Sequence, residues 1–445
     1  MLKFVAIKYL SLALNASRSL VLAALLGPQS FGVLGTLIVV QQYLSYAALG
    51  MREGITVRLA QGGSNPANVL RSSALAWGLS VGLVIVIGFV TFDRLVRPLG
   101  EQWIWVGLIS LLSIANEILI NIHRDQNRLV KVALLEVIYN AVPLICALAF
   151  GSHVTVVLML QSIALGLAFS VAGYLFGLEG LGWRLVSVAA VRQLLSIGIP
   201  MAVSAFFSAS VTSIYVLVAN AMKLGPTVGL IVFANSICMI VMYGSNMIAW
   251  AATSKSMRQL ASIPVDGDTQ RNQRLTYFFR IAVIVSALAV ALSGPLVARF
   301  LPTYAGVERY ALLFCLLQSS SLLLYVEMNF LTVKGRSPMI VAGYGAMLTG
   351  TLLVYAAVPA IDIVDLVSVG ILFSMLVGVA CAWQCHELGL RSASLRSQFV
   401  FLTFPLLCAV AFRAAGPLAA AVVSLGFLGR ALLTGRRVFL LKGAA

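Results

Sequence analysis

The sequence predicts an all-α polytopic membrane protein with about fourteen transmembrane helices. Its composition is the first observation: 61% of the 445 residues are hydrophobic and 10% are charged, which is too little polar surface for a soluble protein of this length. The second observation is the presence of long uncharged runs, such as residues 74–92. Roughly 18 apolar residues are enough to span a bilayer as a helix. The third is a pattern that recurs in the two halves of the chain.

Fourteen hydrophobic segments follow one another along the chain. Twelve are long enough to cross a bilayer without difficulty, and the last two are shorter. The predicted spans are residues 4–26, 31–48, 74–92, 103–122, 129–150, 154–178, 199–222, 228–251, 277–297, 310–333, 339–358, 366–385, 399–415 and 417–433.

The basic residues support this order of spans. With the N-terminus in the cytoplasm and the side alternating at each span, most of the 30 Lys and Arg residues fall on the cytoplasmic side. Such a bias is typical of membrane proteins. We therefore expect both termini in the cytoplasm, and the net charge of +16 does not require a nucleic-acid partner.

A Gly-Pro signal recurs 198 residues apart. LGPQSFGVLG begins at Leu26 and LGPTVGLIVF begins at Leu224, each between two predicted spans. Gly ends a helix and a following Pro prevents its continuation, although the signal is also common helix punctuation. The offset places the first two spans over the seventh and eighth, which predicts two six-helix bundles related by a pseudo-twofold axis along the membrane normal. Parallel repeats of this kind are a transporter architecture, with the substrate between the halves.

These repeats predict four parts of the chain. An N-lobe covers residues 1–178 and a C-lobe covers residues 197–388. Between them, residues 179–196 are predicted to form an amphipathic linker on the cytoplasmic face. Residues 389–445 hold the last two spans and a basic tail.

The first span carries a polar stripe. Lys8, Ser11, Asn15 and Arg18 follow spacings of three, four and three, so they share one face of a helix. Lys8 can instead extend to the membrane interface, but Arg18 is about two turns from the outer end of the span. We expect Arg18 to face inward, where its planar set of donors suits a phosphate.

The second span adds candidates for the same site. Gln41 lies within the span, and Arg52 follows just past its end. Arg52 is placed to meet an anionic headgroup, to pair with Glu53, or to act as an interfacial anchor. The candidate substrate-binding residues are Arg18, Asn15, Lys8, Arg52 and Gln41.

Three intramembrane glutamates are candidates for ion coupling. Glu117, Glu136 and Glu327 lie in the fourth, fifth and tenth spans. Acidic residues at such depth are expensive and often functional, so each is a candidate to take up H⁺ or to hold Na⁺. Each also fits a hydrogen bond or ion pair between helices, for example Glu327 with Lys334.

Metal and cofactor motifs are weak in this sequence. Cys381, Cys385 and His386 are close in sequence but supply too few ligands for a usual zinc site, and buried apolar packing suits the cysteines better. We expect no metal and no cofactor other than a coupling ion, and we find no catalytic motif.

The sequence resembles the polysaccharide-translocase (O-antigen flippase-like) branch of the multidrug/oligosaccharidyl-lipid/polysaccharide exporter superfamily, abbreviated MOP. The resemblance lies in the segments LVLAALLGPQSFGVLGTLIVVQQYLSYAALGMREG, GIPMAVSAFFSASVTSIYVLVANAMKLGPTVGL, LPTYAGVERYALLF and LTVKGRSPMI, and it extends over about twelve spans. Arg18 and Arg52 match, in type and helix, arginines that line the cavity of related lipid II flippases. Many members carry an Asp in the seventh span, where this sequence has Tyr215-Val216, so the resemblance leaves the driving force open.

The resemblance implies a flippase of the bacterial inner membrane. It would move a polyprenyl-diphosphate-linked oligosaccharide to the periplasmic leaflet by alternating access, and it would hand this unit to a polysaccharide polymerase. Two alternatives remain from the sequence. One is a multidrug or cation exporter of the same superfamily, which needs acidic cavity residues. The other is a membrane-embedded glycosyltransferase or polymerase, which usually has larger periplasmic loops than this chain.

Overall fold

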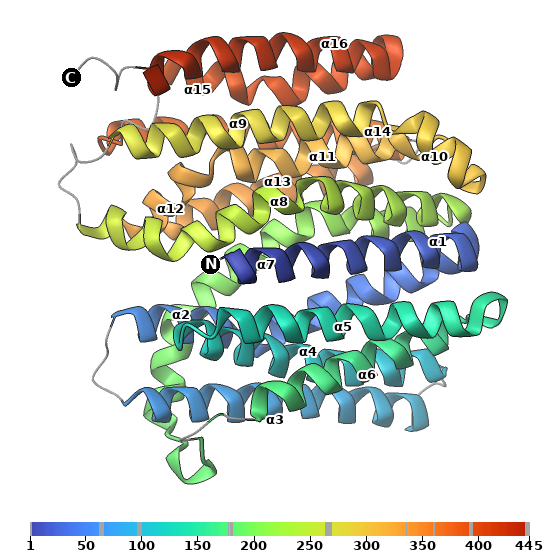
Figure 1. Ribbon diagram of the computed structural model, residues 1–445, viewed down its shortest axis with the longest axis vertical. Helices are drawn as coiled ribbons and strands as arrows, with labels where there is room; N and C mark the ends of the chain where they lie inside the picture. The colour runs from blue at the N-terminus through green and yellow to red at the C-terminus, as the bar shows by residue number, and fades with distance from the viewer. Residues whose placement is uncertain are drawn as a thin grey trace. The chain divides into compact units, whose positions relative to one another are not determined.

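The computed structural model describes residues 2–61, 66–95, 100–176, 178, 181–262, 269–334, 336–358, 361–390 and 395–440. Within these ranges every regular element is a helix, as the sequence predicts (Figure 1). The α-helices are α1 (Leu2–Ser45), α2 (Met51–Gln61), α3 (Ala67–Leu95), α4 (Glu101–Asp125), α5 (Leu129–Phe150), α6 (Val156–Leu175), α7 (Val188–Ala221), α8 (Pro226–Ser262), α9 (Thr269–Ala291), α10 (Gly294–Phe300), α11 (Val307–Leu323), α12 (Tyr325–Val333), α13 (Ser337–Ala357), α14 (Ile363–Glu387), α15 (Leu395–Leu402) and α16 (Phe404–Leu440). Short 3-10 helices are η1 (Tyr46–Ala48), η2 (Gly151–His153), η3 (Trp183–Leu185) and η4 (Pro302–Tyr304).

The predicted number of spans agrees with the helices of the described ranges. Eleven helical stretches there are long and apolar enough to cross a membrane, and α11 with α12 forms a further span bent by 49°. Two of the eleven stretches, 6–48 and 397–433, are each divided by a glycine with non-helical backbone angles. With both divided stretches counted as two spans and the bent pair as one, the total is fourteen. The chain is a multi-pass membrane protein.

Glycines end the helices where the Gly-Pro signals predict. Gly27 has φ of +67° and Gly225 has φ of +51°, in the left-handed region that glycine adopts without strain. Pro28 and Pro226 follow directly, and α8 begins at Pro226. The same device recurs at Gly416, with φ of +81° before Pro417. The Gly-Pro motif therefore separates neighbouring spans at all three places.

The chain reverses direction at Gly27. Lys8 contacts Glu136 near the start of α5, and Thr56, beyond the far end of α1, contacts Arg124 at the end of α4. Because α4 ends only a few residues before α5 begins, both contacts lie at the same end of the bundle, which we call the α4–α5 end. The two halves of α1 are therefore antiparallel, as the short turn predicts.

The structure divides into two compact units. The first unit comprises Met1–Phe206 with Lys223–Val232, and the second comprises Phe207–Met222 with Phe233–Ala445. In the first unit, α4 packs against α2, α3 and α6, while α5 packs against α1 and α6. In the second unit, α9 packs against α11 and α16, and α14 packs against α11 and α13. The lobe boundaries predicted from the sequence stay a prediction.

The segment predicted as an amphipathic surface helix has a different structure. In the described residues 181–187 the regular structure is η3, and α7 already begins at Val188 and continues to Ala221. Residues 188–196 are therefore the first turns of a spanning helix. The charged Arg192 suggests an interfacial helix in the sequence, but the packing of Ala190 and Leu194, both fully buried, joins these turns to the first unit.

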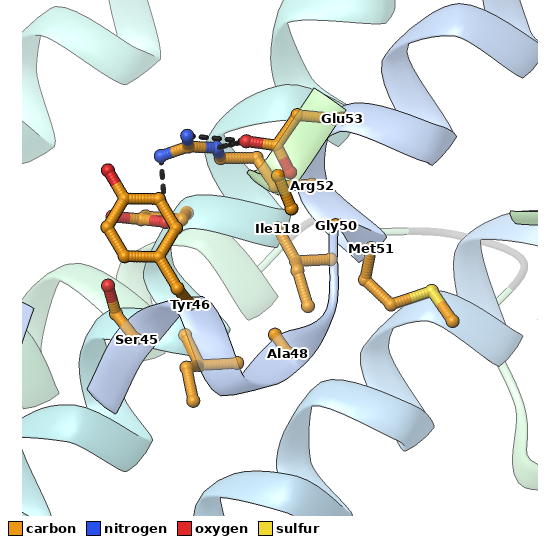
Figure 2. Close-up of a pocket in the computed structure, with 11 residues that line it drawn as sticks. Ser45, Tyr46, Ala48, Gly50, Met51, Arg52, Glu53 and Ile118 are labelled. Carbon is orange, nitrogen blue, oxygen red and sulfur yellow. Dashed lines mark hydrogen bonds and ion pairs between the residues drawn. The ribbon is translucent and has the colours of Figure 1, made fainter. Parts of the chain in front are cut away.

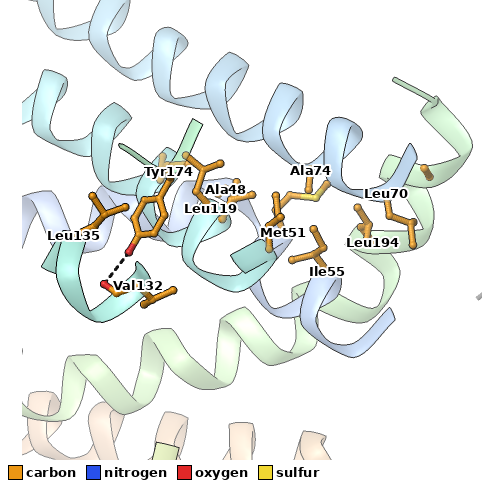
Figure 3. Close-up of a cluster of buried hydrophobic side chains, with 14 residues drawn as sticks. Ala48, Met51, Ile55, Leu70, Ala74, Leu119, Val132, Leu135, Tyr174 and Leu194 are labelled. Carbon is orange, nitrogen blue, oxygen red and sulfur yellow. Dashed lines mark hydrogen bonds between the residues drawn. The ribbon is translucent and has the colours of Figure 1, made fainter. Parts of the chain in front are cut away.

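A buried apolar cluster fixes α2 inside the first unit. It joins side chains from α2 to α7, which Figure 3 shows converging from several helices. Its members are Ala48, Met51, Ile55, Leu70, Ala74, Ile114, Ile118, Leu119, Ile122, Val132, Leu135, Tyr174, Ala190 and Leu194. Met51 and Ile55 have no exposed surface, so the short helix α2 has one defined orientation against α4.

Glycines allow α2 to approach α7 at backbone distance. A Cβ atom built on Gly54 would overlap the carbonyl oxygen of Leu194, and one built on Gly198 would overlap the carbonyl oxygen of Gly50. Small residues at helix contacts of this kind are typical of membrane proteins, where dispersion contacts replace the hydrophobic effect. The α2–α7 contact therefore depends on the absence of side chains at these positions.

We expect Gly54→Ala to lower stability because its methyl group must push α2 away from α7. The expected loss is about 1–3 kcal/mol, as for other overpacked sites. Gly88→Ala in α3 is the matched control, since no atom lies within 4 Å of the added Cβ. Thermal unfolding in detergent, followed by size-exclusion chromatography, measures both. Equal melting temperatures for the two variants would contradict the close contact.

Candidate functional site

Arg52 is at the centre of a charged cluster at the start of α2. Its Nε and Nη2 atoms contact Glu53 Oε1 at 2.7 and 2.5 Å, and its Nη1 donates to Glu117 Oε2 at 3.0 Å. Figure 2 shows the guanidinium beside the carboxylate of Glu53. One arginine thus joins α2 to α4 through a carboxylate on each helix.

The local structure explains why Arg52 takes this position. Gly50 has φ of +80° and turns the chain from η1 into α2, which places Arg52 in the first turn of the helix. The buried side chains of Met51 and Ile55 flank Arg52 on α2, and Ile114 and Ile118 flank Glu117 on α4. The apolar cluster therefore brings the guanidinium and the carboxylate together.

A second arginine extends the cluster along α2. Thr56 Oγ1 donates to the carbonyl oxygen of Arg52 at 2.9 Å and accepts from Arg124 Nη2 at 3.2 Å. Two arginines from two helices are thereby linked through one hydroxyl group. We call Arg52, Glu53, Thr56, Glu117 and Arg124 the Arg52 cluster.

The guanidinium of Arg52 stays charged. Burial alone would lower its pKa, but the nearby carboxylates of Glu117 and Glu53 outweigh this effect and raise the pKa above its usual value. Arg52 lies outside the stretches that qualify as membrane spans. A permanently charged, planar donor group at the end of a span is suited to a phosphate or carboxylate ligand.

A small pocket opens beside the cluster. Its walls include Ser45, Tyr46, Arg52, Glu117 and Ala202, and Figure 2 shows Tyr46 and Ser45 near the guanidinium. The pocket has about 280 Å³ of empty space. This space includes open solvent, so the pocket is a shallow hollow that cannot enclose an oligosaccharide.

The polar stripe of the first span faces α5. Lys8 pairs with Glu136, and Ser11 Oγ accepts from Asn140 Nδ2 at 3.0 Å. Lys8 is 9% exposed. The predicted shared face is therefore present, but its first two members join two helices. The structure contains the alternative named above, an ion pair between two helices. The roles of Lys8 in substrate binding and of Glu136 in ion coupling stay predictions.

Arg18 has a different environment from Lys8. Its Nη2 donates to Asn15 Oδ1 at 2.7 Å, and its guanidinium carbon lies 5.7 Å from the centre of the Tyr139 ring. Its Nη1 is buried and forms no hydrogen bond with the part of the chain that the structure describes. Arg18 is also in none of the ion pairs found between described residues. It therefore retains donor capacity for an anion.

Gln41 is in neither group. It is half-buried in the second half of α1 and does not line the pocket beside Arg52. The role of Gln41 in substrate binding stays a prediction. The sequence thus names residues in two places of the first unit, the α1–α5 contact and the Arg52 cluster, and Gln41 lies outside both.

Glu327 belongs to a polar cluster of the second unit. It lies in the first turn of α12, just after the bend at Leu324, and is 1% exposed. Gln398 Nε2 donates to Glu327 Oε1 at 2.5 Å. Lys334, the partner suggested by the sequence, instead lies 5.7 Å from the Phe330 ring. Gln398 from α15 therefore bonds to the carboxylate, and Arg280 is the cation whose charge acts on it.

Arg280 is a buried residue that the sequence analysis counted only among the basic residues of the cytoplasmic side. It is 2% exposed, donates to Ser397 Oγ at 3.0 Å and lies 4.4 Å from the centre of the Phe401 ring. An arginine inside an apolar run indicates a function or a buried partner, and the sequence of residues 277–297 shows such an arginine. The sequence does not reveal the partners of Arg280 on α15, because they are more than a hundred residues away.

The structure offers no metal centre in the residues that it describes. No group of three or more His, Cys, Asp or Glu side chains there is placed to hold a metal ion. Cys381 and Cys385 are buried in α14. This agrees with apolar packing of the two cysteines.

Known structures share this fold. No protein-family model and no curated protein matches the sequence. Among solved structures, the chain is similar to the lipid II flippase MurJ in an inward closed conformation, with a TM-score of 0.59 and 11% identity over 99% of this chain and 100% of that one. It is also similar to the MATE multidrug transporter DinF-BH, with a TM-score of 0.65 and 16% identity over 89% and 96% of the two chains.

A third similar structure is distinguished by the polarity of its own binding pocket. It is a MOP superfamily transporter from Pyrococcus furiosus, described by a reverse polarity of its binding pocket, with a TM-score of 0.53 and 14% identity over 88% and 96% of the two chains. At these identities the similarity defines the fold. The protein has a MATE/MurJ-like transporter fold, and its structural neighbours are transporters and flippases of the MOP superfamily.

We expect the Lys8–Glu136 pair to stabilise the first unit because it neutralises two charges in an apolar contact. Lys8→Glu should lower stability by up to about 3 kcal/mol, and a second substitution, Glu136→Lys, should restore most of the loss. Reversing the exposed Arg413–Asp365 pair in the same two steps is the control, with an expected change below about 1 kcal/mol. Thermal unfolding of the purified single and double variants measures these changes in stability. If the double variant were no more stable than Lys8→Glu alone, the pairing would be refuted.

Proposed function

We propose that the protein is a flippase for polyprenyl-diphosphate-linked oligosaccharides, of the polysaccharide-translocase branch of the MOP superfamily. It would act in the bacterial inner membrane, with both termini in the cytoplasm, and serve the synthesis of a surface polysaccharide. The expected consumer of the delivered unit is a polysaccharide polymerase. Support comes from the fold, which is shared with a lipid II flippase over nearly the whole chain.

The environment of Arg18 is the observation that carries the proposal. A guanidinium inside an apolar helix normally has a carboxylate partner, but Arg18 has only an amide and an aromatic ring beside it in the described structure. A diphosphate would supply the missing negative charge through two-point hydrogen bonding. The polyprenol tail can remain in lipid while the charged group uses this position.

A multidrug or cation exporter is the second candidate. Its support is the equally good structural similarity to MATE transporters. A cation site needs a carboxylate that is not already neutralised, whereas Glu117 and Glu136 in the first unit are engaged with Arg52 and Lys8. The balance of charge among the described polar groups of this unit therefore favours an anionic substrate.

Coupling to H⁺ or Na⁺ is part of the proposal. Glu117, Glu136 and Glu327 are its candidates, and they lie in three separate clusters. Transport in the presence of a protonophore or without sodium tests which ion, if either, drives the cycle.

Complementation of a bacterium that lacks its own surface-polysaccharide translocase tests the proposal. We expect the protein to restore part of the long-chain polysaccharide, and Arg18→Ala to abolish this restoration because the diphosphate loses its charge partner. Arg18→Lys should retain a fraction of it, and Arg413→Ala, an exposed arginine, should restore as the parent does. Extracted polysaccharide on gels is the readout.

Two outcomes would contradict the proposal. Full polymer production by Arg18→Ala would remove Arg18 from the mechanism. Export of cationic drugs without any rescue of polymer would favour the multidrug alternative.

A further inference from the structure

We propose that Glu117 is a displaceable placeholder: it occupies Arg52 in the empty transporter, and the anionic phosphate of the substrate takes its position on the guanidinium. This inference rests on the proposed function and assigns to Glu117 a role in substrate exchange. It follows from the charge balance of the Arg52 cluster and from the different number of contacts that Arg52 makes with its two carboxylates.

The cluster is electrically neutral when empty. The carboxylates of Glu53 and Glu117 both contact Arg52, and the acidic neighbour of Arg124 is Asp125. An incoming anion meets no excess of positive charge, and its attraction to Arg52 is offset by repulsion from the carboxylates. Strong binding at Arg52 therefore requires one carboxylate to leave.

Glu53 is the carboxylate that stays. It adjoins Arg52 in the chain, accepts from two guanidinium nitrogens and has a side chain that is 13% exposed. It also lies in the first turn of α2, where the helix dipole stabilises a negative charge. Both the chain connection and the helix end favour its present position.

Glu117 is the carboxylate that can leave. It contacts Arg52 through one nitrogen, Nη1, and its side chain is 35% exposed. A contact through one guanidinium nitrogen holds this carboxylate less firmly than the two nitrogens that contact Glu53. Rotation of the Glu117 side chain would vacate the side of the guanidinium that faces α4 without moving a helix.

The pocket beside the guanidinium is where a phosphate would enter. It is lined by Ser45 and Tyr46 together with Arg52 and Glu117. The planar guanidinium is the group here that binds phosphate oxygens, because the two hydroxyl groups already donate to the backbone carbonyl oxygens of Gln42 and Ala205. When the phosphate leaves, the return of Glu117 to Arg52 would discourage rebinding and so favour release.

Binding of a short isoprenyl diphosphate, farnesyl diphosphate, to purified protein in detergent tests the proposal by isothermal titration calorimetry. We expect Glu117→Gln to bind this probe about fivefold more tightly than the parent, because the competing carboxylate is absent. Glu101→Gln, a carboxylate on the same helix bonded to Trp105, is the matched control and should bind as the parent does. Arg52→Gln should bind more weakly, and adding Glu117→Gln to it should give no gain.

Polysaccharide production in the complementation assay supplies a second readout. Glu117→Gln should lower the polymer yield although it binds the probe more tightly, because release is slower. A purely structural role for Glu117 would lower both quantities together. Glu117→Asp, which keeps the charge, should retain more polymer production than Glu117→Gln.

The outcomes separate this inference from the proposed function. Unchanged or weaker probe binding by Glu117→Gln, with loss of binding in Arg52→Gln, would overturn the placeholder role and leave the flippase standing. Tighter binding that persists in the doubly substituted protein would also overturn it, since the gain would not pass through Arg52. If neither the parent nor any variant binds the diphosphate, both proposals fail.

Discussion

Every charge buried among apolar helices needs a compensating group nearby, and this constraint arranges the polar parts of both units. Lys8 has Glu136, Arg52 has Glu53 and Glu117, and Glu327 has Gln398. Arg280 has a serine, an aromatic face and the nearby charge of Glu327. Apart from the Arg52–Glu53 pair within α2, these compensations join different helices, so the charged groups help to specify which helices are neighbours. Arg18 stands out because its described neighbours carry no negative charge.

Apolar packing determines how accurately these charges meet. The short helix α2 has a mixed sequence and would have no fixed orientation by itself, but Met51 and Ile55 enter the buried cluster of the first unit. Gly54 then lets α2 lie against the backbone of α7. The result is a rigid base for Arg52 and a partly exposed partner on α4. For the proposed flippase, a fixed cation beside a carboxylate that can leave would allow the substrate to bind and then be released.

Much of the fold could be predicted because the signals are local. Long apolar runs define the spans, and Gly27, Gly225 and Gly416 have positive φ at the Gly-Pro pairs that separate neighbouring spans. The site was harder to predict. The spacing of Lys8, Ser11, Asn15 and Arg18 correctly indicates a shared helix face, yet it does not indicate whether that face meets α5 or a cavity. For Glu327 the nearest cation in sequence suggested a partner, and the structure supplies Gln398 instead.

The sequence by itself determined that the protein is helical, that it crosses the membrane about fourteen times and where most helices end. Hydrophobic length and the backbone preferences of Gly and Pro act over a few residues, so they can be recognised in the sequence without knowledge of the fold. Only the tertiary structure decided which charges are paired, that residues 188–196 begin a spanning helix, and that Glu117 meets Arg52. Those contacts join residues far apart in the sequence, such as Lys8 and Glu136, which are 128 positions apart. They depend on the packing of whole helices, which no local pattern encodes.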